Sequence, residues 1–353
     1  VASLLLAACG APKVDTQATQ VAAGVAATVA AQAAQTPLVV VVTPPPPAEP
    51  AAATAAPPAE IDLADLHLEA DGSGDLATLA DALVQSPEGA TITLGPGTFR
   101  LERALTVAGS LHLVGAGRDR TEIISGVGDW VLRFQGNGPF TATGITFRYD
   151  GDAPSEVVDV VSGEVQFQDC RFTGAVKEEG TGIGNGLALG GNASGEVSGS
   201  EFLDNAGHGI LLWEQAGVMV RDNLIRASGT GIAYFDNSGG QAVNNEVVAS
   251  EWYGIYADDR AAPALEDNTL RDSGEAAIAY YGNAAGTAEG NVCTGSGSTA
   301  ILVAENAVPA LAANECQLAG TVAELPAPAA GREIAYSAWR YDNEDIYVMY
   351  ADG

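Results

Sequence analysis

Apolar and polar positions repeat with one fixed period between about residue 180 and residue 320. Large aliphatic residues recur every 22 or 23 residues, namely Leu187, Ile210, Ile232, Ile255, Ile278 and Ile301. Asparagines keep the same spacing, at Asn223, Asn245, Asn268, Asn291 and Asn314. Two more rows share it, one at Phe202, Ile225, Val247, Leu270, Cys293 and Cys316, the other at Val197, Val220, Ala242, Leu265, Ala288 and Leu311. A self-similar period of this length indicates a solenoid.

The type of solenoid follows from the residues within each repeat. Apolar residues alternate over short runs, as in Ile210-x-Leu212 and Ile232-x-Tyr234, which is the spacing of β-strands. Helical segments with a period of 3.6 and the leucine-rich repeat frame are both missing from the pattern. We therefore predict an all-β fold, a single-stranded right-handed parallel β-helix of about ten coils. Coils about 4.8 Å apart would stack the five asparagines inside, where they can hydrogen-bond one another.

A short helix is expected where the solenoid begins. Residues 76–85 are amphipathic, and Ser73 or Asp75 would cap the helix, which would then cover the apolar open end. The preceding stretch Asp71-Gly72-Ser73-Gly74-Asp75 lacks the glycine and glutamate that complete a calcium loop, so a helix-entry turn is the better interpretation.

Two early segments carry a family resemblance. Residues 90–99 (ATITLGPGTF) and 111–117 (LHLVGAG) closely resemble the first coils of the pectin-lyase-like superfamily. The later repeats resemble the carbohydrate-binding and sugar-hydrolase (CASH) and NosD-like β-helix repeats, and together the resemblance covers about residues 70–325. It implies the fold but no single function, because this superfold includes lyases, hydrolases, esterases, adhesins and inert scaffolds.

The N-terminal region predicts export. Residues 1–9 resemble the end of a bacterial lipoprotein signal peptide in which Cys9 would carry the lipid; an ordinary signal peptide with an incidental cysteine, or a core strand, is the alternative. Residues 10–60 are rich in Ala and Pro and predict a disordered tether. The β-helix would then occupy residues 61–325 on the outside of the cell, lipid-anchored to the bacterial surface and touching the membrane only through that lipid.

The C-terminal region predicts a second unit. Residues 326–353 contain two strand-like segments, 334–337 and 345–353, that resemble the opening hairpin of a TolB-type β-propeller blade. Because a propeller needs about four to eight blades, we expect the natural protein to continue beyond Gly353.

The composition of the chain limits its possible binding partners. The chain has 45 Asp and Glu against 15 Lys and Arg, a formal net charge of −30, and 47% of its residues are hydrophobic. This acidity argues against nucleic acid and against an anionic membrane surface, since both bind through Lys and Arg. The apolar content is ample for a core, and we expect a monomer.

One outer flank combines aromatic and acidic residues. Three positions after the isoleucines of the first row (210, 232, 255, 278 and 301) lie Trp213, Phe235, Asp258, Tyr281 and Ala304. Four positions after the same isoleucines lie Glu214, Asp236, Asp259, Gly282 and Glu305. Flat apolar faces beside hydrogen-bond acceptors suit a sugar. We therefore predict Trp213, Phe235, Asp258, Tyr281 and Glu305 as ligand-binding residues. In the alternative, the aromatic residues only shield a strand edge and the acids keep the surface soluble.

The same acids are catalytic candidates. Carboxylates on neighbouring or alternate coils would lie about 5 or about 10 Å apart, which brackets the separations of retaining and inverting glycosidases. Asp236 with Asp259, or Glu214 with Asp259, could then act as acid and base, although any acidic ladder on a β-helix meets this distance test. Gly207-His208-Gly209 resembles a polygalacturonase motif. The companion motifs Asn-Thr-Asp and Arg-Ile-Lys are missing, so His208 is interpreted as a turn residue.

The sequence gives weaker support for a metal site and for a disulfide. Asp236, Asp258 and Asp259 could hold Ca²⁺ as in a polysaccharide lyase, but a face so poor in Arg and Lys would repel a polyuronate. No His/Cys cluster has metal-ligand spacing, so no other cofactor is expected. Cys293 and Cys316 share an inward row, where strain in a bridge between stacked side chains favours two packed thiols over a disulfide. Cys170 falls in the asparagine row without a partner.

Three functions remain open. The first is recognition of an extracellular polysaccharide or glycan along the Trp213–Tyr281 flank, without catalysis. The second is a polysaccharide-degrading enzyme, a glycoside hydrolase before a Ca²⁺-dependent lyase. The third is a protein-interaction or spacer module for a downstream propeller.

Overall fold

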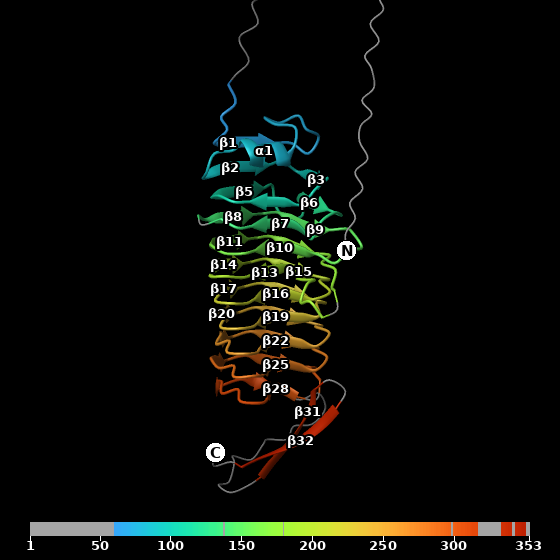
Figure 1. The fold of residues 1–353 in the computed structure, drawn as a ribbon, viewed down its shortest axis with the longest axis vertical. Helices are drawn as coiled ribbons and strands as arrows, with labels where there is room; N and C mark the ends of the chain where they lie inside the picture. Colours follow the sequence, from blue (N-terminus) through green and yellow to red (C-terminus); the bar gives the residue numbers. More distant parts are fainter. Residues whose placement is uncertain are drawn as a thin grey trace, which may run out of the picture. The chain divides into compact units, whose positions relative to one another are not determined.

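The body of the molecule is a stack of parallel β-strands, seen edge-on in the computed structural model of Figure 1. The structure describes residues 60–316 except 137, 179 and 298, together with the backbone of residues 333–340 and 343–350. Each coil of the described solenoid passes through three sheets in turn, here called A, B and C. The eleven strands of sheet A are β1 (Asp65–Leu68), β2 (Ala90–Leu94), β5 (Leu111–Gly115), β8 (Phe140–Thr143), β11 (Glu164–Gln168), β14 (Ser194–Ser198), β17 (Gly217–Arg221), β20 (Gly239–Val243), β23 (Ala264–Glu266), β26 (Thr287–Glu289) and β29 (Ala310–Ala312).

Sheets B and C complete the coils within the same described range. Sheet B contains β3 (Gly97–Leu101), β6 (Thr121–Ser125), β9 (Thr146–Tyr149), β12 (Arg171–Thr173), β15 (Glu201–Leu203), β18 (Leu224–Arg226), β21 (Glu246–Val248), β24 (Thr269–Arg271), β27 (Val292–Thr294) and β30 (Glu315–Cys316). Sheet C contains β4 (Leu105–Val107), β7 (Trp130–Phe134), β10 (Glu156–Val160), β13 (Leu187–Leu189), β16 (His208–Leu212), β19 (Thr230–Tyr234), β22 (Tyr253–Ala257), β25 (Ala276–Tyr280) and β28 (Thr299–Val303). The predicted β-helix is confirmed, with eleven strands in sheet A where about ten coils were expected.

The core is built from the repeating aliphatic rows. The register of sheet C places Leu187, Ile210, Ile232, Ile255 and Ile278 in one file, and each is fully buried. Ile301, on the last strand of that file, is only partly buried. In sheet B the rings of Phe147, Phe172 and Phe202 stack with centroids 5.6 and 4.7 Å apart. Residues 22 or 23 apart in sequence therefore touch in space.

The five asparagines form a single file at the turn between sheets A and B. The Nδ2 of Asn245 donates to Oδ1 of Asn268 at 2.9 Å, and its backbone N donates to the same oxygen at 3.0 Å. The same pair of bonds links Asn223 to Asn245, Asn268 to Asn291 and Asn291 to Asn314. Each Nδ2 also donates to a main-chain carbonyl of the preceding coil, as Asn268 does to Ala242 at 2.8 Å. The file thus satisfies side-chain and backbone groups that would otherwise be buried without partners.

The capping helix is present but begins later than expected. The helix α1 spans Leu79–Gln85, and its N-cap is Thr78, not Ser73 or Asp75. The Thr78 hydroxyl accepts from the backbone N of Asp81 at 3.0 Å and donates to its carboxylate at 2.7 Å, which fixes the first turn. Asp75 instead accepts from the backbone N of His67 at 2.7 Å. Leu79 and Ala82 are buried against the solenoid core, at the end of the stack where β1 lies (Figure 1).

The cysteines correct a second expectation. Cys293 and Cys316 form a disulfide rather than two packed thiols, because the parallel pairing of β27 and β30 sets their Cα atoms only 4.2 Å apart. Cys170 is a buried free thiol, and burial raises its pKa to about 12.

The C-terminal strands pair as expected, whereas the N-terminal predictions lie outside the described residues. The strands β31 (Glu333–Arg340) and β32 (Asn343–Tyr350) form an antiparallel pair. Cys9, the signal segment and residues 10–59 of the predicted tether are not among the described residues. In the part of the chain that is described, no helix is long and apolar enough to cross a membrane.

The asparagine file yields a stability prediction. Replacing Asn268 by Ala removes the acceptor of the buried backbone N of Asn245 and of one of its two Nδ2 hydrogens, the other still being bound to Val220 O; each unsatisfied group costs about 1–3 kcal/mol. We expect Asn268→Ala to lower the free energy of unfolding by about 2–4 kcal/mol in urea titrations. Asn283→Ala, at an exposed position, is the matched control and should unfold like the parent. Equal urea midpoints for the two variants would show that the file contributes nothing.

Candidate functional site

The outer face of sheet C carries three rows of outward residues. In β16, for example, His208 and Leu211 are half-exposed, whereas Gly209, Ile210 and Leu212 between and after them are buried. The third row is the residue that follows each strand, such as Trp213 after β16. Main-chain hydrogen bonds keep this third row aligned from coil to coil: the N of Phe235 donates to Leu212 O at 2.9 Å, and the equivalent bonds recur at Asp258 and Tyr281. Each row therefore continues across neighbouring strands.

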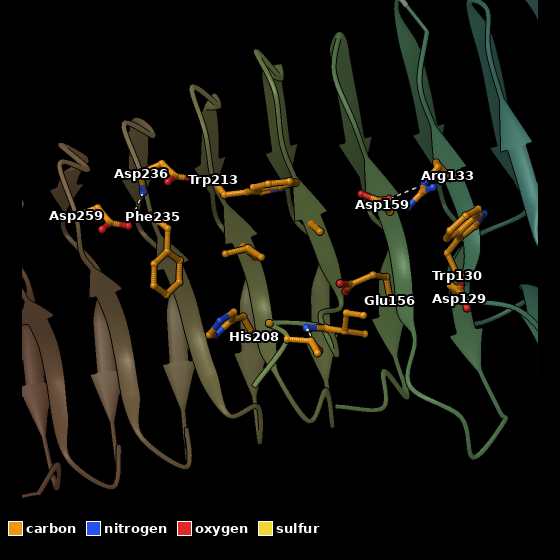
Figure 2. Close-up of a pocket in the computed structure, with 15 residues that line it drawn as sticks. Asp129, Trp130, Arg133, Glu156, Asp159, His208, Trp213, Phe235, Asp236 and Asp259 are labelled. Atoms are coloured by element: carbon orange, nitrogen blue, oxygen red, sulfur yellow. Dashed lines mark hydrogen bonds and ion pairs between the residues drawn. The ribbon is translucent and has the colours of Figure 1, made fainter. Parts of the chain in front are cut away.

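A cavity of about 580 Å³ lies on this face and crosses several strands. Its lining residues come from the three outward rows, from the residue before β7, from the turns after β19 and β22, and from the segment between β12 and β13: Asp129, Trp130, Arg133, Glu156, Asp159, Thr181, Gly182, Ile183, Ala188, His208, Leu211, Trp213, Phe235, Asp236 and Asp259. Figure 2 shows these side chains along one face, from Asp129 and Trp130 at one end to Asp259 at the other. The volume lies within the range of about 300–1,000 Å³ that is usual for ligand pockets.

One end of the cavity contains a stacked ion pair. The Nε of Arg133 donates to Oδ2 of Asp159 at 2.6 Å, and its Nη2 forms an ion-pair contact with the same oxygen at 2.6 Å. The same guanidinium lies 3.4 Å from the ring centroid of Trp130. Asp159 is only 8% exposed, and burial raises its pKa while Arg133 opposes the rise. The two contacts hold Arg133 in place, so Trp130 and Asp159 share one cation.

Glu156 lies beside this pair on β10. Its Oε2 accepts from the backbone N of Asn185 at 2.7 Å, and its Oε1 accepts from Asn185 Nδ2 at 3.1 Å. Burial raises the pKa of Glu156 to about 7, the bonds from Asn185 oppose the rise, and the charge of Asp159 adds to it. The carboxyl of Glu156 therefore changes charge near neutral pH.

His208 occupies the equivalent position two strands further along. Its backbone N donates to Asn185 Oδ1 at 2.9 Å, but its Nδ1 is buried without a hydrogen-bond partner. Burial lowers the pKa of His208 to about 4, and the nearby charge of Lys177 lowers it further. His208 is thus neutral at physiological pH and lines the cavity.

Aromatic side chains extend the face beyond the cavity. Phe235 lies 5.9 Å from the ring of His208 and 5.5 Å from Tyr256, measured between centroids. Tyr256 in turn stacks on Tyr253 at 4.9 Å and approaches Tyr281 at 5.5 Å. The hydroxyl of Tyr256 donates to Asp258 Oδ2 at 2.6 Å. These rings are all half-exposed, so they present an apolar strip in line with the cavity.

Trp213 lines the cavity beside Phe235, the first ring of this strip after His208. It is 38% exposed, and a side chain at Gly190 on the preceding coil would collide with its indole, 2.6 Å from Nε1. The indole therefore lies against the backbone of the neighbouring coil, on the Asp159 side of its own strand (Figure 2). A second, more open depression shares Trp213 and Asp236 and adds Glu214.

The acidic column has a structural role. Glu214, Asp236, Asp259 and Glu305 each adopt a positive φ between 56 and 59°, and their carboxylates bind the backbone N one coil earlier. Glu214 accepts from Gly191 N at 2.6 Å, Asp236 from Glu214 N at 3.0 Å and Asp259 from Asp236 N at 3.2 Å. Glu305 does the same for Gly282 at 3.0 Å. The three predicted catalytic acids, and Glu305, predicted to bind ligand, therefore complete the turns of the solenoid.

The structure brings together some predicted residues and separates others. Trp213, Phe235, His208, Asp236 and Asp259 line the cavity. Asp258, Tyr281 and Glu305 lie outside the cavity lining: Asp258 adjoins Asp259, Tyr281 continues the row of Phe235 and Asp258 on the next coil, and Glu305 continues the row of turn acids.

Sequence reasoning missed Asp129, Trp130, Arg133, Glu156 and Asp159. The early coils are longer, since register partners Leu132 and Val158 are 26 residues apart and Val158 and Leu187 are 29 apart. The available signal was the apolar pair Val157-Val158, which matches the buried pair of each later strand and places Glu156 and Asp159 in the outward rows.

Calcium binding gains no support on this face. Across the described residues, no group of three or more His, Cys, Asp or Glu side chains is arranged to hold a metal ion. Asp258 is bonded to Tyr256, and Asp236 and Asp259 accept from backbone nitrogens, so the three carboxylates do not converge.

Comparison with known proteins gives a family match over part of the chain. Residues 158–315 match the family described as right handed beta helix region. A search of curated proteins gives no match.

Several solved structures are similar. ORF18 of Geobacillus virus E2 is 12% identical with a TM-score of 0.49, over 67% of this chain and 60% of that chain, so less than two thirds of its length is covered. Pectate lyase Pel9A is 13% identical with a TM-score of 0.49, over 69% of this chain and 78% of the lyase. Pectin methylesterase from carrot is 13% identical with a TM-score of 0.48, over 77% and 87%.

The raised pKa of Glu156 predicts a pH effect on stability. A carboxyl that binds its proton more tightly when folded stabilises the protein fully below its ordinary pKa of 4.5 and loses that contribution as the pH rises through about 7. Relative to Glu156→Gln, the parent should lose up to about 3 kcal/mol of unfolding free energy between pH 4.5 and pH 8. Paired urea titrations measure this difference. The variant keeps Asp159, Arg133 and His208, so a difference that does not change with pH would refute the assignment.

Proposed function

We propose that the outer face of sheet C binds a polysaccharide chain outside the cell, without cleaving it. The observation that carries the proposal is the continuity of one face: the cavity opens onto half-exposed rings that follow one another from His208 to Tyr281. Sugars stack on such rings through their C–H faces, and carboxylates and hydroxyls beside the rings accept from sugar hydroxyls. A linear face suits a linear ligand that contacts several coils at once.

The carboxylates favour binding over hydrolysis. Asp236 and Asp259 are already hydrogen-bonded to backbone nitrogens in the turns, and so is Glu214. A general acid or base must be free to exchange a proton with the substrate. These three acids support the turns instead, so we place the sugar contacts on Trp213, Phe235, Tyr281 and the cavity.

We further propose that the solenoid is displayed on a bacterial surface by a lipid on Cys9 and a tether formed by residues 10–60, and that residues 333–350 begin a TolB-type propeller. The signal-like segment that ends in Cys9 supports the anchor, and the paired strands β31 and β32 are compatible with the propeller. Expression of the native gene with radiolabelled palmitate should label the protein, and Cys9→Ser should abolish the label. Equal labelling of both proteins would exclude the anchor.

Sugar binding is tested at Trp213. Thermal shift with neutral hexasaccharides (cellohexaose, xylohexaose and N-acetylchitohexaose) selects the tightest binder, because a ligand that binds only the folded state raises Tm. We expect Trp213→Ala to weaken that binder about tenfold in calorimetry, since loss of an aromatic stacking contact costs about 1.4 kcal/mol.

The matched control is Met219→Ala. Met219 lies on β17, the next strand of the same coil, and faces outward from sheet A. Its replacement should leave the affinity unchanged. An affinity that survives Trp213→Ala would remove the proposed site.

A further inference from the structure

We infer that the ligand of this face is a polysaccharide whose sugars carry free, protonated amino groups, an inference that rests on the carbohydrate binding proposed above. The charges of the cavity favour this class of sugar.

The cavity lining is strongly acidic. It carries five carboxyl groups, Asp129, Glu156, Asp159, Asp236 and Asp259, against one cationic side chain, Arg133. Glu214 adds another carboxylate in the adjoining depression. Walls of one sign concentrate the field inside a cleft and raise the local concentration of ligands of opposite charge.

The single cation of the lining is already engaged. Arg133 is paired with Asp159 at 2.6 Å and lies over the Trp130 ring, so its charge is already compensated before a ligand binds. Lys177 lies close enough to lower the pKa of His208, but its ammonium sits 4.3 Å from the Trp252 ring centroid, and Lys177 is not among the lining residues. The carboxylate of a uronic acid would therefore have to compete with Asp159 for the one cationic side chain among the described lining residues.

The acids of the cavity are poorly hydrated, so a cation would stabilise them. Burial raises the pKa of both Glu156 and Asp159, which shows that water solvates their charged forms incompletely. A ligand ammonium near Glu156 would favour its ionised form and form a charge-assisted hydrogen bond.

The rings fit an amino sugar as well as they fit a neutral one. Trp and Tyr faces attract an ammonium group through their quadrupoles, and they also stack on the apolar face of a sugar ring. Trp130 already binds one cation in this way. A metal ion would not use the rings and finds no cluster of ligands in the described residues. A basic peptide would satisfy the charge but not the extended aromatic strip.

The first experiment compares ligands on the intact 353-residue chain. Calorimetry at pH 6 would use a hexamer of β-1,4-linked glucosamine, its fully N-acetylated counterpart, a galacturonate hexamer and hexalysine. We expect the glucosamine hexamer to bind about tenfold or more tighter than the N-acetylated one, since hydrogen bonds to charged groups are the stronger class. Raising the salt from 50 to 500 mM should remove most of this preference. The galacturonate hexamer should not bind.

The second experiment neutralises single acids. Glu156→Gln and Asp129→Asn should each weaken the glucosamine hexamer about five- to tenfold and weaken the N-acetylated hexamer by a clearly smaller factor, since only the charged ligand loses an ion pair. Asp129 is exposed, so its replacement tests the inference even if Glu156→Gln does not fold. Glu164→Gln removes the same charge from an exposed position on β11 in sheet A and should change neither affinity.

The outcomes separate this inference from the function on which it rests. Equal affinity for the two chitin-type hexamers, or binding of the galacturonate, would overturn the amino-sugar preference and leave sugar binding intact. Hexalysine binding as tightly as the glucosamine hexamer would overturn it too, because charge alone would then suffice. If no oligosaccharide binds, both proposals fail.

Discussion

The register between coils is the constraint on which the rest of the structure depends. A parallel ladder places each residue over its equivalent one coil later, so a residue type that is tolerated once must be tolerated along a whole file. Asn245 illustrates the interior case, because its amide bonds to the asparagines of both neighbouring coils, Asn223 and Asn268, and to the main chain at Val220. Asp236 illustrates the surface case, because its carboxylate binds the backbone of the preceding turn at Glu214. In both files a polar side chain forms hydrogen bonds from one coil to the next. The same register aligns Trp213, Phe235 and Tyr281 on one outer face.

In a regular scaffold of this kind, some acidic side chains support the turns and others are placed to contact a ligand. Asp236 and Asp259 reach the cavity from the turns that follow their strands, whereas Glu156 and Asp159 project into it from strand β10 itself. The two groups differ in their surroundings: burial raises the pKa of Glu156 to about 7, and the turn acid Asp259 is exposed. Perturbed ionisation in a cavity marks functional sites more often than an acidic surface does. For this reason the cavity, rather than the acidic column, is the centre of the proposed site.

The sequence predicted the fold well because the repeat is explicit where it is regular. The column from Leu187 to Ile278 and the asparagine file both follow from counting, and each lies where its period places it. Local chemistry was harder, since Thr78 rather than Ser73 or Asp75 caps α1, and a choice among neighbouring cap residues depends on packing of Leu79. About half of the site could not be located by counting along the repeat. Trp213 and Phe235 lie in the regular coils, but Trp130 and Glu156 lie on coils of unequal length, where no period identifies an outward position.

The irregular coils are also where a cavity can form. Strictly repeated coils give a flat ribbed wall, because each side chain is covered by its equivalent on the next coil. The segment between β12 and β13 breaks this rule, since Val158 and its partner Leu187 are 29 residues apart in place of 22 or 23. The extra residues supply Thr181, Gly182 and Ile183 to the cavity wall. Gly184, with φ of +119°, returns the chain to the ladder at a point where a Cβ would lie 2.7 Å from the Cα of Lys177. A wall of this kind depends on the long segment and its glycine together, so the cavity belongs to the place where the repeat is interrupted.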